Sequence, residues 1–214
     1  MQGMAEYEDN HFDLAIVDPP YGITATNGWD ITKPSRPNHK AMVGLGYQKY
    51  DNTKEWDKLK PDREYFVELF RISKNQIVWG ANYFVEHLPV SKGWIYWNKG
   101  LDYENSFNFS HGELAFTSFD TRLLSYKISP KAETRGGKDR VHPTQKPIAL
   151  YKWLLTKYAK EGDLILDTHV GSASSLIACE DMGFNYVGFE IDKDYYEAAR
   201  KRLKQFRKQL KLAL

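Results

Sequence analysis

Residues 18–21, Asp-Pro-Pro-Tyr, bring together residue types that could do chemistry on a flat ring. They directly follow the hydrophobic run FDLAIV at residues 12–17, so Asp18 and Tyr21 stand where a buried strand ends. Proline fixes φ and has no amide hydrogen, which stiffens the turn and removes competing donors beside the acid. The segment has two interpretations: a tight turn after a strand, or a site that grips a flat ring bearing an amino group.

A second candidate site combines a glycine turn with two acids. The run LILD ends at Asp167, and Gly171 allows a tight turn into the next helix. The run YVGFE ends at Glu190, 19 residues beyond that glycine. An acid at this spacing reaches the ribose hydroxyls in a Rossmann-type nucleotide site.

The ligand expected at this turn is an adenosine compound without a pyrophosphate. The three-glycine dinucleotide fingerprint is absent, because Ser172, Ala173 and Ser174 stand where close backbone approach would need glycine. This argues against NAD and FAD. Asp167 is an anion at the tip of its strand and could pair with a ligand cation. An ordinary strand–helix–strand unit with a glycine in its turn stays open as the alternative.

The elements that must position these residues alternate between strands and helices, which predicts an α/β fold with a mostly parallel sheet covered by helices on both faces. Residues 22–61 and 120–141 are polar and irregular and are expected to be loops. We expect strands at 12–17, 75–80, 93–100 and 112–119, a helix from Asp62, a helix over 147–159, a strand–turn–helix–strand unit over 163–192, and a last helix from Asp194.

The composition is that of an ordinary soluble globular protein. The chain has 214 residues, of which 42% are hydrophobic and 27% charged, with a net charge of +2. Its single cysteine, Cys179, excludes an internal disulfide framework and a cysteine-based zinc site. There is no signal-peptide pattern and no run of roughly 20 apolar residues. We therefore expect a cytoplasmic protein that does not enter the membrane.

Three motifs carry a resemblance to a known family. DPPY at 18–21, HPTQKP at 142–147 and DTHVGSAS at 167–174 occur in that order. Together they resemble the DNA amino-methyltransferases that use S-adenosylmethionine, and specifically their circularly permuted β class, in which the catalytic motif precedes the cofactor motif. The resemblance implies a Rossmann-like methyltransferase fold with permuted motif order, in a single domain spanning residues 1–214.

The resemblance implies that residues 18–21 are catalytic. The Asp18 carboxylate and the Pro19 carbonyl would accept the two hydrogens of the exocyclic amino group of a flipped-out base, aiming its nitrogen lone pair at the methyl carbon. Pro20 would keep the turn rigid, and Tyr21 would stack on the base, which repays part of an unstacking cost of a few kcal/mol. Methyl transfer is then an in-line displacement from a sulfonium that needs no metal.

The resemblance also implies that S-adenosylmethionine is the cofactor and DNA the partner. Asp167, Gly171 and Ser172 would line the methionine part of the cofactor, and Glu190 would bind its ribose. Residues 142–147 would precede a helix packed beside them, near the cofactor carboxylate; alternatively, Pro147 merely opens that helix and His142 is incidental. The cofactor-binding candidates are Asp18, His142, Thr144, Gln145, Lys146, Asp167, His169, Gly171, Ser172, Ser174 and Glu190.

Two features depart from the family pattern. Ala173 stands where many members have a second glycine, and we expect its small methyl group to be accommodated. Only eleven residues precede Phe12, where the family has a strand and a short acidic turn, so we expect the sheet to lack an edge of the adenine pocket. The chain would then be truncated or minimal.

The two long loops are the expected DNA-facing segments. Both loops, at about 22–61 and 120–141, carry several lysines and arginines, and the first interleaves them with aromatic residues, which suits phosphates and unstacked bases. Mixed-charge loops are also common without DNA, and the basic face of the last helix is expected to be solvated.

The expected activity is adenine-N6 methylation of DNA in a restriction-modification setting, because the acid form of the motif goes more often with adenine in this class. Cytosine-N4 methylation shares the chemistry and stays open. A rival of another class is a catalytically weak DNA-binding relative, which the missing edge strand would favour. The resemblance also leaves a homodimer open.

Overall fold

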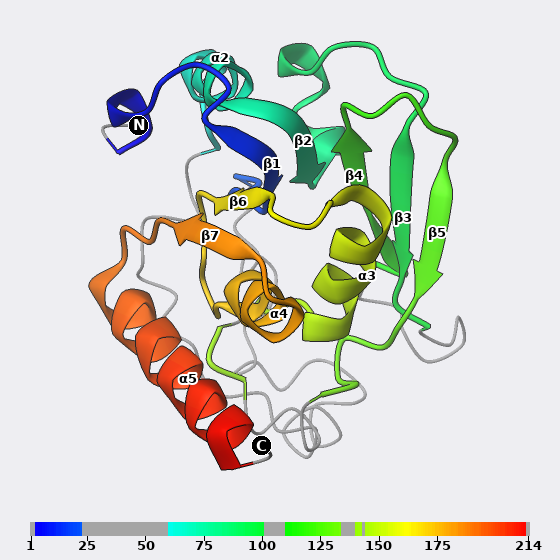
Figure 1. Cartoon of the computed structure of the whole chain (residues 1–214). Helices are drawn as coiled ribbons and strands as arrows, with labels where there is room; N and C mark the ends of the chain where they lie inside the picture. The colour runs from blue at the N-terminus through cyan, green and yellow to red at the C-terminus, as the bar shows by residue number, and fades with distance from the viewer. Residues whose placement is uncertain (1–2, 23–59, 101–109, 134–139, 143, 213–214) are drawn as a thin grey trace, which may run out of the picture.

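The computed structural model describes residues 3–22, 60–100, 110–133, 140–142 and 144–212. Within them, seven strands form one sheet in the order β5-β3-β4-β2-β1-β6-β7 (Figure 1). The strands are β1 Phe12–Val17, β2 Ser73–Trp79, β3 Trp94–Asn98, β4 Gly112–Thr117, β5 Leu124–Lys127, β6 Leu164–Asp167 and β7 Asn185–Gly188. The helices are α2 Arg63–Ile72, α3 Ile148–Tyr158, α4 Ser174–Met182 and α5 Lys193–Leu212, with short 3-10 turns η1 Met4–Glu6, η3 Ala81–Tyr83 and η4 Val85–His87.

Strand β1 lies at the centre of the sheet and is buried on both faces. It pairs in parallel with β2 on one side and β6 on the other. Because side chains alternate along a strand, Leu14 and Ile16 join the core beneath α3 and α4, whereas Ala15 and Val17 join the core beneath α2. This two-sided burial explains why the strand reads as a continuous hydrophobic run.

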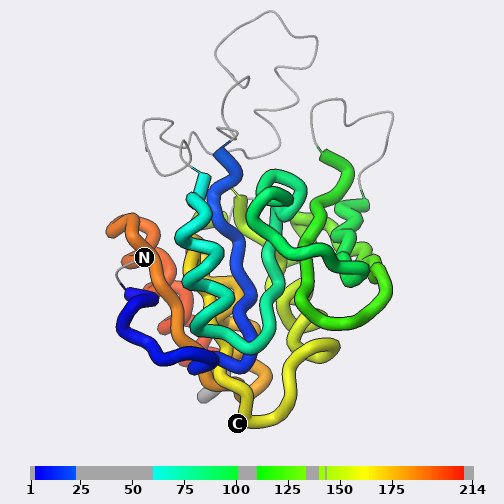
Figure 2. The backbone as a smooth tube through the Cα atoms, turned by 90° about the horizontal axis from the view of Figure 1, so that it is seen from above, coloured from blue at the N-terminus to red at the C-terminus, as the bar shows by residue number. Residues whose placement is uncertain are grey.

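Helices cover the two faces as expected: α3 and α4 lie against one face and α2 against the other (Figure 1). The predicted start of α2 is confirmed, because the Asp62 carboxylate accepts a hydrogen bond from the Tyr65 amide at 3.0 Å and so caps the helix. Figure 2 shows α2 running beside β1 along its length. The helix buries Tyr65, Phe66 and Leu69 against the strands.

Strand β4 runs antiparallel to both of its neighbours, β2 and β3, while the other pairings are parallel. Its register sets Ala115 opposite Trp79, the last residue of β2. Glu113 therefore lies at the edge of the sheet where the parallel strands β1, β2 and β6 end. Lys99 directly follows β3 and reaches the same edge, because β3 also runs antiparallel to β4.

The expectation of a loop throughout residues 120–141 is wrong at β5, which pairs in parallel with β3 at the sheet edge. The strand alternates between half-buried and exposed residues, so its sequence is too polar to read as a buried strand. Leu124 and Tyr126 have the period-two spacing of a half-buried strand. Tyr126 stacks on Trp153 of α3 with ring centroids 4.9 Å apart, which holds the edge strand against the helix.

The other end of the described sheet is β7, and no described strand pairs with its outer edge. Residues 3–11 form the η1 turn and then a second turn, in which the His11 amide donates to the Glu8 carbonyl at 3.3 Å. Met4 is buried there, and the Tyr7 ring lies 4.8 Å from that of Phe12 and 6.2 Å from that of Phe189. This segment thus packs against β1 and the end of β7 without adding to the sheet.

Candidate active site

A cavity of about 980 Å³ opens beyond the carboxyl ends of the central parallel strands, where ligands bind in open α/β sheets. It brings together most of the residues singled out in the sequence, from segments more than a hundred residues apart. The predicted residues that line it are Asp18, Pro19, Pro20, Tyr21, His142, Thr144, Gln145, Lys146, His169, Gly171, Ser172 and Glu190. The two that do not line it, Asp167 and Ser174, lie buried in the turn behind its wall.

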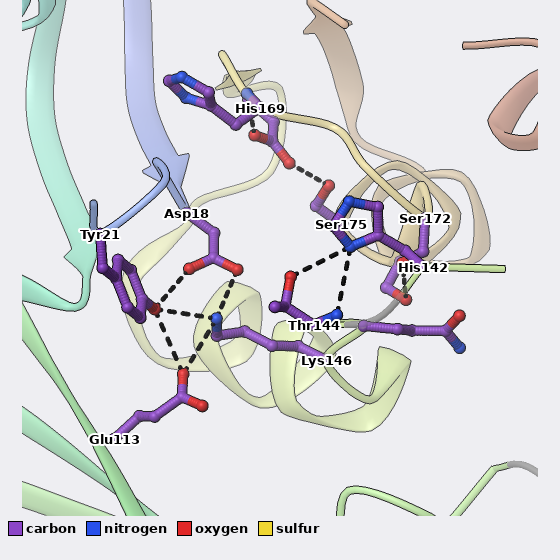
Figure 3. Close-up of polar contacts among 12 residues, drawn as sticks. Asp18, Tyr21, Glu113, His142, Thr144, Lys146, His169, Ser172 and Ser175 are labelled. Carbon is purple, nitrogen blue, oxygen red and sulfur yellow. Dashed lines mark hydrogen bonds and ion pairs between the residues drawn. The ribbon is translucent and has the colours of Figure 1, made fainter. Parts of the chain in front are cut away.

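Asp18 lies at the centre of a polar cluster at the end of β1 (Figure 3). Its Oδ1 accepts a hydrogen bond from the Tyr21 hydroxyl at 2.7 Å, and its Oδ2 accepts one from the Lys146 ammonium. Lys146 also forms an ion pair with Glu113 at 3.0 Å. The DPPY turn therefore places both oxygens of one carboxylate in contact with donors at the mouth of the sheet.

Glu113 is a site residue that the sequence reasoning missed. It is the second residue of β4, and its Oε1 lies 2.7 Å from the Lys99 ammonium. Burial opposes ionisation of Glu113, but Lys146 and Lys99 together lower its pKa to about 2. The signal was an acid inside a stretch predicted to be a strand, where a charge needs a buried partner.

The cluster balances its charges. Burial raises the pKa of Asp18 above its usual value, and the Lys146 ammonium opposes that shift. Burial works against the charged form of Lys146, but Asp18 and Glu113 raise its pKa overall, so it keeps its proton. Burial raises the pKa of Tyr21 well above its usual value, so its hydroxyl remains a donor. Two carboxylates thus face two ammonium groups, counting Lys99.

The position of the Tyr21 ring depends on Gly80, the residue that follows β2. The ring stacks on Tyr83 with centroids 5.1 Å apart and planes 17° from parallel. Gly80 has φ +65°, and a Cβ placed on it would lie well inside 3.0 Å of the Tyr21 ring carbons. The glycine therefore allows both the left-handed turn into η3 and the close approach of the tyrosine ring.

The glycine turn forms the other half of the cavity. Gly171 adopts φ +49°, and its amide donates to Glu190 Oε2 at 2.8 Å, while the Asp192 amide donates to Glu190 Oε1 at 2.9 Å. Ala173 has φ +61° and caps α4. The expected accommodation of its methyl group is thus achieved in a left-handed conformation that disfavours alanine, which explains a preference for glycine at this position.

Asp167 is buried beneath this turn and holds it by hydrogen bonds. Its Oδ1 accepts a hydrogen bond from the His169 amide at 2.9 Å, and its Oδ2 accepts one from the Ser175 hydroxyl. Burial raises its pKa to about 7. Ser174 likewise bonds within the turn, with its hydroxyl 3.0 Å from that of Ser172. Both predicted residues therefore hold the loop that lines the cavity.

The HPTQKP segment divides between the two halves of the cavity. The buried His142 ring lies over Gly171 and against the Tyr195 ring, with centroids 4.3 Å apart. Its Nδ1 accepts a hydrogen bond from the Thr144 amide at 3.3 Å. Lys146 instead points away from the glycine turn, toward Asp18 (Figure 3). His142 is therefore packed into the site, and Lys146 belongs to the cluster around Asp18.

Two further supports of the glycine turn were not expected. Arg202 of α5 donates to the Ser172 carbonyl at 2.7 Å and to the Ser174 hydroxyl at 2.9 Å, so one residue of the basic helix face is not solvated. On the other side, the Tyr65 hydroxyl lies 2.6 Å from the Thr168 hydroxyl. Helices from both faces of the sheet thus fix the turn.

The expected DNA-facing loops lie partly outside the described residues, which include neither 23–59 nor 134–139. In the described part of the second loop, Glu133 accepts hydrogen bonds from the Ile148 and Ala149 amides, both at 2.6 Å, and caps α3. Within the described residues no group of three or more His, Cys, Asp or Glu side chains could hold a metal ion. No described helix is long and apolar enough to cross a membrane.

Comparison with known proteins places these features in context. The model of a family described as DNA methylase, for N6 and N4 methyltransferases, matches residues 48–201. The chain is 25% identical over 229 residues to the type II methyltransferase M.HpaI of Haemophilus parainfluenzae, covering 95% of this chain and 71% of that protein. It is 40% identical over 76 residues to M2.DpnII of Streptococcus pneumoniae, a match covering 36% of this chain and 27% of that protein.

Solved structures share the fold at low identity. A crystal structure of the M1.HpyAVI–SAM complex has a TM-score of 0.55 at 18% identity, with 90% of this chain and 89% of that chain covered. The cytosine-N4-specific PvuII DNA methyltransferase has a TM-score of 0.57 at 12% identity, with 96% of this chain and 86% of that chain covered. These matches confirm the Rossmann-like methyltransferase fold. The circularly permuted motif order stays a prediction, as do a homodimer and a cytoplasmic location.

Proposed function

The chain belongs to the DNA methylase family, and from that premise we propose that it transfers a methyl group from S-adenosylmethionine to the N6 amino group of adenine in DNA. The observation that carries the proposal is the meeting of the Asp18 cluster and the glycine turn in one cavity. An acceptor site and a cofactor site must share such a space, because the methyl group passes directly between them.

The residues of the second half of the cavity fit S-adenosylmethionine. Glu190 supplies a carboxylate for the ribose hydroxyls. The neighbouring Ile191 also lines the cavity, and because its side chain is 93% exposed it provides an apolar surface on which a purine can lie. Gly171 and Ser172 offer backbone and hydroxyl groups beside them. The cavity volume of about 980 Å³ leaves room for both a cofactor and a base. When bound, the cofactor supplies a methyl group on a cationic sulfur.

The acceptor half fits a primary amino group on an aromatic ring. Asp18 and the Pro19 carbonyl supply acceptors, whereas neither Pro19 nor Pro20 has an amide hydrogen that could compete. Tyr21 supplies a ring for stacking, and Asn82 and Tyr83 extend the wall beside it. Acceptors that hold both amino hydrogens keep the nitrogen lone pair free of the ring and direct it toward the methyl carbon.

Identification of the methylated nucleoside tests the proposal directly. The protein is incubated with tritiated S-adenosylmethionine and unmethylated DNA, and the DNA is digested to nucleosides. We expect the label in N6-methyladenine. Label in N4-methylcytosine would keep the reaction and correct the base. A protein that labels no nucleoside and binds no cofactor by calorimetry would be the non-catalytic DNA-binding relative.

Glu190→Ala is expected to weaken S-adenosylmethionine binding by about 1–3 kcal/mol, because a charged hydrogen bond to the ribose is lost. The same change removes the hydrogen bonds that the Gly171 and Asp192 amides donate to Glu190, and this further weakens cofactor binding. Calorimetric titration of both proteins measures the difference in Kd.

Glu197→Ala is the matched control, since Glu197 is an exposed acid on α5 outside the cavity. We expect its Kd for the cofactor to equal that of the unmodified protein. An unchanged Kd in Glu190→Ala would remove Glu190 from the ribose site.

A further inference from the structure

Lys146 occupies a closed position between two acids. Its ammonium contacts Asp18 Oδ2 and lies 3.0 Å from Glu113 Oε2, and its side chain is only 3% exposed. The Trp79 ring lies 5.4 Å from the ammonium and the Tyr21 ring 5.8 Å, so aromatic faces enclose the charge. A surface lysine that happens to reach an acid would not be enclosed in this way.

The Lys146 ammonium bonds the carboxylate that the proposed function assigns to the target amino group. Asp18 Oδ1 accepts a hydrogen bond from the Tyr21 hydroxyl and Oδ2 accepts one from Lys146, so an incoming amino group must share one of these oxygens with a donor already present. Lys146 donates an N–H to Oδ2, as an exocyclic amino group would. The amino group and the lysine therefore crowd the same oxygen, and a shift of the lysine away from Oδ2 would favour binding of the base.

Glu113 provides a second position for the lysine within the same enclosure. Its Oε2 already lies 3.0 Å from the Lys146 ammonium, while Lys99 occupies Oε1 at 2.7 Å. A small shift of Lys146 toward Oε2 would release Asp18 without moving the charge into solvent. Figure 3 shows the ammonium between the two carboxylates. No described acid other than Asp18 and Glu113 forms an ion pair with Lys146.

We propose that Lys146 is a positioning residue for the acceptor carboxylate: it favours the ionised form of Asp18 and orients it before the base binds, and it transfers to Glu113 when the amino group of the target base takes its place. This step rests on the proposed function and adds two residues, Lys146 and Glu113, to the machinery that presents the base. The lysine contacts Asp18 rather than the reacting atoms, so its effect is exerted through that carboxylate.

The sign of the expected pH dependence follows from the groups around Asp18. The groups that face it are the carboxylates of Glu113 and Asp167, the hydroxyls of Tyr21, Tyr65 and Tyr151, and the Lys146 ammonium. Burial and Glu113 raise the pKa of Asp18, and Lys146 opposes them. Removal of the lysine charge therefore raises that pKa further, and removal of the Glu113 charge lowers it. A protonated Asp18 is a poorer acceptor, so activity is lost as the pH falls through its pKa.

The first test reads the charge of Asp18 without using activity. The carboxyl carbons of aspartate are labelled with 13C, the Asp18 signal is assigned with an Asp18→Asn variant, and its titration is followed by NMR. We expect the Asp18 midpoint to rise by at least about one pH unit in Lys146→Met and to fall in Glu113→Gln. Lys152→Met, which removes a half-buried lysine of α3 that pairs with Asp181 of α4, is the control and should leave the Asp18 midpoint unchanged.

The second test measures single-turnover methylation of DNA against pH. In Lys146→Met the fall in rate at acid pH should begin at a higher pH, and the rate should partly recover at pH values above the new midpoint. A merely structural defect would lower the rate equally at every pH. In Glu113→Gln the lysine loses its second position, so KM for DNA should rise about tenfold with kcat at saturating DNA within about threefold.

The outcomes separate this proposal from the proposed function. The role of Lys146 would be overturned if the Asp18 titration midpoint were the same in the unmodified protein and both variants, or if the KM for DNA were unchanged in Glu113→Gln. Either result would do so even if DNA is methylated. If Lys146→Met does not fold, the Glu113→Gln titration and KM decide alone. An unmodified protein that methylates no DNA would refute the proposed function, while the NMR titration would still show whether Lys146 controls Asp18.

Discussion

Asp18→Ala is expected to reduce methyl transfer by roughly 10²–10³-fold or more, while S-adenosylmethionine binds with nearly unchanged affinity. In the proposed function the carboxylate accepts one of the two amino hydrogens of the base, and no other acid directly follows β1. The glycine turn, by contrast, is held by its own contacts to Glu190, Asp167 and Arg202. Single-turnover methylation and calorimetric titration of the cofactor separate the two effects.

Asp18→Asn is the matched variant, because the amide keeps one acceptor oxygen and nearly the same shape. We expect it to retain more activity than Asp18→Ala, although Lys146 then has only Glu113 as its partner. Loss of cofactor binding in Asp18→Ala would show that Asp18 belongs to the cofactor half of the cavity. Full activity in that variant would exclude the whole assignment of the acceptor site.

The parts of the fold that local patterns control were predictable from the sequence. Strand β1, the capped start of α2 and the strand–turn–helix–strand unit follow from hydrophobic periodicity and from the residues that begin and end helices. Strand β5 was not predictable in this way. Its stability comes from pairing with β3 and from the stacking of Tyr126 on Trp153, two contacts with distant parts of the chain.

The residues of the candidate site also differ in whether local sequence patterns or distant contacts determine their positions. Asp18 and Gly171 follow strands within recognisable motifs, so their place at the carboxyl edge of a parallel sheet could be inferred. Glu113 could not, because its place depends on β4 running antiparallel, which brings the start of that strand to the edge where its neighbours end. The family resemblance implied that Lys146 lies near the cofactor carboxylate, but its long side chain reaches Asp18.

The contacts among these residues explain how a buried carboxylate can remain an acceptor. A lone buried acid would take up a proton, and a fixed ion pair would block the base. A lysine shared by two acids counters both effects, because its charge opposes the protonation of Asp18 while Glu113 offers the lysine a second position nearby. Lys99 keeps Glu113 charged as well, so the cluster as a whole remains neutral.

Gly80→Ala is expected to lower the rate of methyl transfer about a hundredfold, because misplacement of a positioning group by about 1 Å can cost that much. The new methyl group cannot share the space of the Tyr21 ring, and φ +65° is unfavourable for alanine. The ring must leave its stack on Tyr83, and its hydroxyl then loses its bond to Asp18. Single-turnover methylation at saturating DNA measures the effect, and chemical denaturation measures the stability.

Gly162→Ala separates the two causes, since Gly162 also has positive φ, at +88°, but a Cβ there would meet nothing within 4 Å. Both substitutions carry a backbone cost of about 1 kcal/mol or more. Only Gly80→Ala displaces Tyr21, so only it should lose activity in protein that remains folded. Equal activity of the two variants would mean that the exact place of the Tyr21 ring does not matter for methyl transfer, and that Tyr21 is not the residue on which the base stacks.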